Sequence, residues 1–254
     1  MVQAPQRTAL SGPALVRLLA RLTDADVPES SQSLSDRLSQ WLGWTDAIGL
    51  SSALNGNSPT VAAGTRAFGA AEENECARTR IALTNAIATD AVFGTARRGG
   101  SARIAGHGAA MPQTDTPVDY AMFRQRYQSI QQSMETGIGG LRGRLRSLLA
   151  TRSPDMARLA VVDAVMERAL AAREQSLLGA VPGLLAAHFA RLRQSEQAAL
   201  AAAEATAEVA GEVLPTPPGT WLGVFRKDMQ SVLLAELDVR FQPVEGLLAA
   251  LRAS

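Results

Sequence analysis

The chain has 254 residues, 25 basic and 24 acidic side chains, and a formal net charge of +1. Its 46% apolar residues and balanced charge argue against global disorder. One cysteine excludes an internal disulfide, and with only two histidines the chain cannot supply the four Cys or His ligands of a structural zinc site.

Alanine and leucine dominate the composition, with 46 and 31 copies. Both are strong helix formers, and the alternation of period two that marks a β-strand is absent. The sequence therefore predicts an all-α protein, an irregular multi-helix bundle with long C-terminal helices.

Residues 1–94 are expected to form an N-terminal helical region. The expected helices span residues 13–22, 34–54 and 70–93. Ser11 is a candidate N-cap for the first helix. Gly43 and Gly49 are candidate breaks in the second.

Residues 95–115 are rich in Gly, Ala and Arg and predict a flexible linker. A structureless stretch of this length is uncommon inside a compact domain. We therefore place the main boundary of the chain there.

A C-terminal helical bundle is expected over residues 116–254. Thr116 followed by Pro117 resembles a helix start. Five apolar residues then recur every seven positions, namely Tyr120, Tyr127, Met134, Leu141 and Leu148. Their apolar companions shift from the third to the fourth following position, which indicates either a local break near Gly137–Gly143 or a wide buried face.

Further helices are expected downstream. Ser153, Pro154 and Asp155 predict the next start, and this helix should reach about Ala210 with a kink or split at Val181–Gly183. A last helix should run from Trp221 to Phe241, after which Pro243 begins a short terminal helical turn.

No residue is a good candidate for catalysis. Cys76 lies among glutamates, which oppose thiolate formation. His188 lies on an apolar helix face, and His107 lies between two glycines in the linker, where no fixed geometry holds a base. We expect a protein that is not an enzyme, with no cofactor and no metal. An enzyme that uses only carboxylates is left open, although no acid pair marks it.

Two groups of residues are candidate partner-binding sites. Trp41 and Trp44 stand out because aromatic residues are scarce here and are favoured at interfaces, although their helical spacing favours core packing over an interface. Arg142, Arg144 and Arg146 form a basic run at the end of a long helix. We expect a protein partner, and a homodimer is left open.

Charge is unevenly distributed along the chain. Six arginines and one glutamate between residues 120 and 152 give +5, whereas residues 194–213 hold four glutamates and no base, giving −4. These patches suit pairing with each other or with a partner. Nucleic acid is the alternative partner, through Arg97–Arg103 and Arg142–Arg152, but the chain lacks the basic excess that such proteins usually show.

No stretch reaches the roughly 18–20 apolar residues that span a bilayer. Arg17 and Arg21 interrupt the apolar part of the N-terminus, which argues against a secretory signal. The expected location is the cytoplasm, extending to the periphery of the inner membrane.

The two ends of the chain resemble one known family. They read TALSGPALVRLLARLTDADVPESSQSLSDRLSQWLGWTDAIGLSSALNG and FRKDMQSVLLAELDVRFQPVEGLLAAL. Both resemble an uncharacterised proteobacterial family of proteins of about 250 residues, known only as a domain of unknown function. The resemblance implies an accessory role in a cell-envelope assembly and brings no catalytic residues.

Together these observations favour a non-enzymatic cytoplasmic scaffold or adaptor that binds helical partners. The most specific version of this hypothesis is an accessory protein of a cell-envelope membrane complex.

Overall fold

The computed structural model describes residues 12–25, 32–55, 69–93, 118–210 and 220–253. Over these ranges the chain forms helices and no strand, which confirms the all-α prediction. The helices are α1 (Ala14–Thr23), α2 (Leu34–Trp41), α3 (Trp44–Asn55), α4 (Ala70–Ala88), α5 (Tyr120–Leu149), α6 (Pro154–Gly179), α7 (Val181–Ala210) and α8 (Thr220–Ala253).

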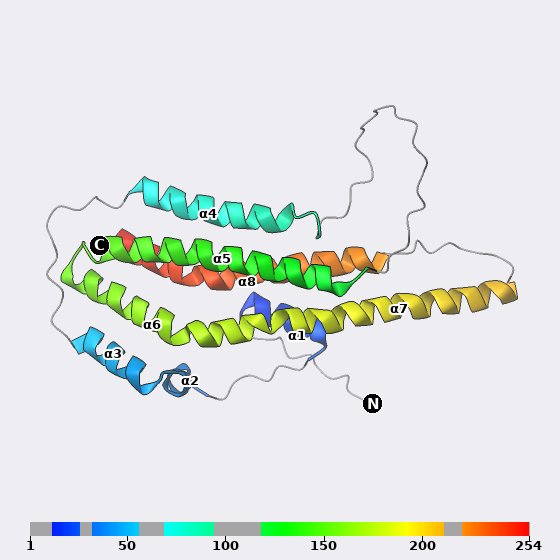
Figure 1. Cartoon of the computed structure of the whole chain (residues 1–254), viewed down its shortest axis with the longest axis horizontal. Coiled ribbons are helices and arrows are strands. Elements are labelled where there is room, and N and C mark those ends of the chain that lie inside the picture. The colour runs from blue at the N-terminus through cyan, green and yellow to red at the C-terminus, as the bar shows by residue number, and fades with distance from the viewer. Residues whose placement is uncertain (1–11, 26–31, 56–68, 94–117, 211–219, 254) are drawn as a thin grey trace, which may run out of the picture.

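Two long helices, α5 and α8, lie side by side at the centre of the molecule (Figure 1). Helix α4 packs against both of them, while α6 and α7 follow one another along the other side. Helix α1 packs on α7 and α8, and α2 and α3 pack on α6. The core is a single apolar cluster to which α1, α4, α5, α6, α7 and α8 all contribute.

The buried face of α5 has a period of eleven residues. Its buried side chains are Phe123, Tyr127, Ile130, Met134, Ile138, Leu141, Leu145 and Leu149. Tyr127, Ile138 and Leu149 are thus eleven positions apart, close to three full helical turns, so they lie on nearly the same face of the helix, with a slow drift opposite in hand to that of a seven-residue repeat. The shift of the apolar companions therefore reflects this longer period, because α5 is continuous through Gly137–Gly143.

The predicted helix starts and breaks are partly confirmed. Ser153 caps α6 by accepting the backbone N–H of Met156, with Pro154 in the first turn. Ala180 separates α6 from α7, so the expected split is present. Thr116 and Pro117, where a helix start was predicted, lie outside the described residues; α5 begins later, at Tyr120, and the Asp119 carboxylate accepts the N–H of Ala121. A carboxylate placed one residue before the helix competes well for this capping role.

The other boundaries agree with the prediction only in part. Pro13 occupies the N-cap of α1, and Ser11, the predicted cap, lies outside the described residues. The expected second helix breaks at Gly43 as predicted, between α2 and α3, whereas Gly49 remains inside α3. Helix α8 continues through Pro243 to Ala253, because the residues beyond the proline are held in the core. Packing thus overrides the local preference of proline to end a helix.

The predicted linker at 95–115 lies outside the described residues. Phe93, which precedes it, lies beyond the end of α4 but is only 1% exposed. None of the helices in the described ranges has an apolar stretch long enough to cross a membrane.

Candidate functional site

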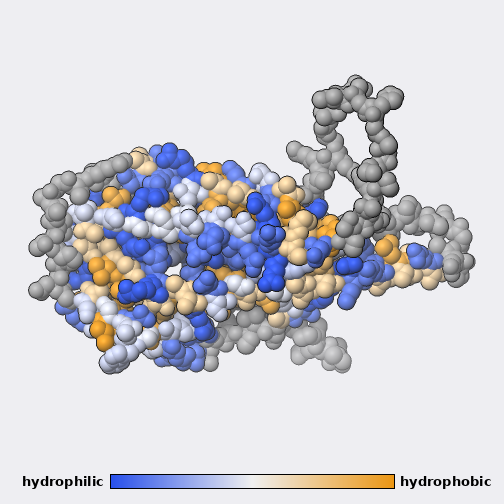
Figure 2. Space-filling model, in the orientation of Figure 1, coloured by the Kyte–Doolittle hydropathy of each residue, from blue (hydrophilic) through white to orange (hydrophobic). Residues whose placement is uncertain are grey.

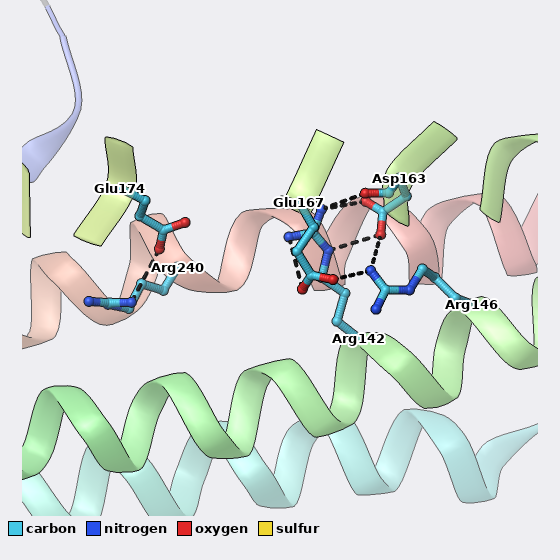
Figure 3. Close-up of polar contacts among 6 residues, drawn as sticks. All are labelled: Arg142, Arg146, Asp163, Glu167, Glu174 and Arg240. Carbon is cyan, nitrogen blue, oxygen red and sulfur yellow. Dashed lines mark hydrogen bonds and ion pairs between the residues drawn. The ribbon is translucent and has the colours of Figure 1, made fainter. Parts of the chain in front are cut away.

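Arg142 and Arg146 join α5 to α6 (Figure 3). Arg142 donates to both carboxylate oxygens of Asp163, from Nε at 2.9 Å and from Nη2 at 2.6 Å. Arg146 donates to Asp163 at 3.2 Å and also to Glu167. Bidentate geometry makes the first pair a strong, directional contact, and only 13% of the Arg142 side chain is exposed.

Arg144 points to a different helix. Residues four apart share a helix face, whereas a residue between them faces away. Arg144 accordingly pairs with Glu75 of α4 at 2.7 Å, where 55% of the arginine side chain is exposed. The three predicted arginines therefore do not converge on one surface, and each contacts a carboxylate of this chain.

A second polar cluster lies inside the bundle. The fully buried carboxylate of Glu236 accepts hydrogen bonds from the Tyr127 hydroxyl at 2.7 Å, from Gln131 at 2.9 Å and from Arg240 Nε at 2.8 Å. Arg240 also reaches Glu174 of α6 at 3.2 Å (Figure 3). Burial, and then the Glu236 carboxylate, raise the pKa of Tyr127. The cluster thus links α5, α6 and α8. This cluster was not predicted from the sequence, although a glutamate in the apolar run VLLAEL was a usable signal.

The other titratable candidates are also packed. His188 is 8% exposed and lies 2.9 Å from Asp228, with Phe225 beside its ring. Cys76 is 3% exposed, and burial together with Glu75 raises the pKa of its thiol. A raised pKa disfavours the reactive thiolate. No group of His, Cys, Asp and Glu within the described ranges is arranged to hold a metal ion.

The two predicted tryptophans lie in different environments. Trp41, at the end of α2, is half-buried, and the guanidinium carbon of Arg173 lies 5.2 Å from its ring centroid. Trp44, the first residue of α3, is 82% exposed. Ile48, one turn later, is 50% exposed, and Leu34 at the start of α2 is 72% exposed.

We call Leu34, Trp44 and Ile48 the α2–α3 surface. Neither α2 nor α3 has a buried residue, and both pack on α6 from outside the bundle. Figure 2 shows some hydrophobic residues among polar ones at this end of the molecule. Singly exposed apolar residues are ordinary, but an exposed tryptophan with apolar neighbours is typical of a binding surface.

An open groove lies at the other end of the molecule, between α7 and the start of α8. Its lining residues are Leu192, Ser195, Glu196, Ala199, Leu200, Thr220 and Trp221. It is shallow and mostly apolar, which suits a peptide or a helix better than a reacting small molecule.

The chain belongs to the family described as Protein of unknown function (DUF3348), whose model matches residues 1–253. No curated protein and no solved structure matches the chain.

Proposed function

With membership of this family as the premise, we propose that the protein is a non-enzymatic adaptor that binds a helical protein partner through the α2–α3 surface. The observation that carries this proposal is the exposure of Trp44 beside Ile48 on a helix that buries none of its residues. Aromatic anchors of this kind dominate the binding energy of protein interfaces.

The position of this surface supports the same function. Helices α2 and α3 add little to the core, so the free energy of folding alone does not explain an apolar face on them. Burying one large apolar side chain contributes about 1.5–3 kcal/mol. Trp44 and Ile48 together would therefore supply a substantial part of the affinity for a partner.

The finer features of the proposal come from the sequence. The family resemblance supports an accessory of a cell-envelope complex, with a cytoplasmic location at the periphery of the inner membrane. The partner would then be an inner-membrane protein. A homodimer is the simplest variant of the proposal, with a second copy in place of that protein.

Nucleic-acid binding receives no support from Arg142 and Arg146, the two largely buried arginines of the predicted basic run. Binding to phosphate groups needs cationic side chains that can give up their existing ion pairs at a low cost in free energy. Arg142 and Arg146 are 13% and 20% exposed and engage Asp163 and Glu167. The segment Arg97–Arg103 lies outside the described residues.

Affinity purification from the native cell in mild detergent, with quantitative mass spectrometry, tests the adaptor function. We expect one protein to be recovered in amounts comparable to the tagged chain. The double substitution Trp44→Ala and Ile48→Ala should lower its recovery at least about tenfold, the equivalent of 1.4 kcal/mol.

The matched control is Ile81→Ala with Met122→Ala. These side chains are 58% and 51% exposed, on α4 and α5, and their truncation should leave recovery unchanged. Equal recovery by the Trp44 variant, or the absence of any stoichiometric partner, would overturn the proposal. Recovery of an inner-membrane protein would support the finer form.

A further inference from the structure

Helix α6 faces the centre of the bundle with charged side chains. Residues three, four or seven positions apart share a helix face. On the face of α6 that meets α5 and α8, these residues are Ala160, Asp163, Glu167, Glu174 and Leu178. Ala160 and Leu178 are the buried residues of α6 that belong to the apolar core, and three acids lie between them.

The three acids are paired with arginines of the bundle (Figure 3). Arg142 and Arg146 reach them from α5, and Arg240 reaches them from α8. A buried ion pair contributes little net stability, because the cost of removing both charges from water offsets their attraction. Apolar burial, in contrast, stabilises in proportion to its area. Helix α6 is therefore held to the bundle largely by contacts that water can replace.

The outer face of α6 packs on α2 and α3. Val165 is 6% exposed and lies outside the core cluster. It faces α3, since a Cβ atom added at Gly49 would lie 3.7 Å from it. Arg173 lies over the Trp41 ring of α2, with its guanidinium carbon 5.2 Å from the ring centroid. Helices α2 and α3 should therefore follow α6 if it moves.

Both ends of α6 have the features of a hinge. Ala180 alone separates α6 from α7. Pro182 has no N–H, so the Leu178 carbonyl lacks its usual helical donor, and Gln131 of α5 donates to it instead at 3.0 Å. At the other end, residues 150–153 connect α5 to α6. Hinges are formed by a few such residues at the ends of elements.

We propose that α6, together with α2 and α3, moves away from α5 and α8 while the rest of the bundle stays folded. The open state hydrates the acids and arginines that the closed state pairs, so it lies at lower free energy than the unfolded chain. The proposal goes beyond the adaptor function and does not rest on it. A partner bound to the α2–α3 surface would move with α6.

Thiol labelling of the full chain tests this opening. Ala160→Cys places a thiol on α6 where the native residue is 5% exposed, and Ala235→Cys places a matched thiol on α8 where the native residue is 6% exposed. We expect a maleimide to label the first at least about tenfold faster than the second, because α6 opens locally and α8 does not. Val165→Cys should label more slowly than Ala160→Cys, because α3 leaves with α6.

Further substitutions in the Ala160→Cys background examine the ion pairs. Asp163→Ala leaves Arg142 without its closest partner and should speed labelling at least about tenfold. Arg142→Met with Asp163→Met replaces the pair by apolar contacts and should slow labelling severalfold. The matched control is Asp238→Ala, whose carboxylate pairs at an exposed site with an arginine of α4 and whose loss should leave the rate unchanged.

Circular dichroism, and slow labelling of the native Cys76 that is 3% exposed on α4, show that each variant keeps the bundle folded. Equal rates for Ala160→Cys and Ala235→Cys would overturn the proposal, as would an unchanged rate in the double methionine variant.

Labelling of Val165→Cys as fast as that of Ala160→Cys would also overturn it, because α6 would then separate from α3 as well. None of these rates depends on Trp44 or on a recovered partner. Failure of this proposal is therefore distinct from failure of the adaptor function.

Discussion

Glu236 is a carboxylate with no exposed surface in a helix that otherwise packs apolar side chains. It is tolerated because Tyr127, Gln131 and Arg240 all donate hydrogen bonds to it. A buried charge without its partner is expensive, whereas a buried ion pair often contributes little net stability. The effect of removing one partner therefore differs from that of removing both.

We predict that Arg240→Met lowers the free energy of unfolding by about 3–5 kcal/mol. The double substitution Glu236→Gln with Arg240→Met should recover most of that loss. Urea denaturation measures the free energy of unfolding of the single and the double variant, with Arg80→Met as the control. Arg80 also bridges two acids, Asp238 and Glu245, but is 39% exposed, so its loss should cost less than about 1 kcal/mol. An equal cost for the two single variants would contradict this account.

The two tyrosines make stability fall at high pH. Burial raises the pKa of Tyr120 to about 12, and burial with Glu236 raises that of Tyr127 as well. In the unfolded chain both have pKa values of about 10. A raised pKa contributes stability that is complete below the unfolded value and is lost as the pH rises through the folded value.

Between pH 10 and 12 the free energy of unfolding should therefore drop by up to about 1.4 kcal/mol per pH unit for each tyrosine. Urea titrations across this range measure the slope, and Tyr127→Phe should remove about half of it. Tyrosinate absorbance of the folded protein provides the check. A midpoint near pH 10 would show that both hydroxyls are accessible and would refute the prediction.

The contacts between side chains of different helices were the feature least predictable from the sequence. The sequence shows that Arg142 and Arg146 share a helix face. It does not show which helix lies opposite, so Asp163 and Glu167 could not be named. Trp44 posed the same problem, since aromatics suit cores and interfaces alike. Only the tertiary packing decides between these possibilities.

At the scale of the helices, prediction was better because periodicity reports burial directly. The seven-residue spacing from Tyr120 correctly placed Tyr127, Met134 and Leu141 on the buried face of α5, although the period of that face is eleven. Ser153–Pro154 marked the start of α6. The failures lie at boundaries, where a local signal competes with packing. Pro243 is the clearest case, because α8 continues past it to bury Val244 and Leu251.

Pro243 leaves the carbonyl of Val239 without its usual helical donor. We predict that Pro243→Ala raises the free energy of unfolding by about 1–3 kcal/mol, since it restores that hydrogen bond and removes the ring clash. Thermal and urea unfolding measure the change. Gly246→Ala, one turn later with open space around the added carbon, should gain about 1 kcal/mol from helix propensity alone.

Loss of stability in the proline variant, with the expected gain in the glycine variant, would have a different meaning. It would show that a bend at Pro243 is needed to seat Val244 and Leu251 in the core. The pair of substitutions thus separates helix propensity from packing at the end of α8.

For the whole molecule, the helices differ in how firmly they are held. Helices α5 and α8 form the centre, and arginines fasten α6 to both of them. Helices α2 and α3 pack on α6 and bury no residue. The fold thus consists of a central bundle and a pair of helices that packs on α6 without burying a side chain, and that pair carries the proposed binding surface.

Hydrogen exchange should reveal this division. Elements with few buried contacts open locally at much lower free energy than the core. We predict protection factors in α2 and α3 at least about a hundredfold below those in the centre of α5, equivalent to about 3 kcal/mol. Mass spectrometry of peptides covering Leu34–Asn55 and Phe123–Leu145 measures both in one experiment. If α2 and α3 were protected as strongly as α5, they would be integral to the bundle. The exposure of Trp44 would then no longer indicate a binding surface. The adaptor function requires a further result: adding the recovered partner protein should slow hydrogen exchange in α2 and α3 and leave exchange in the other helices unchanged.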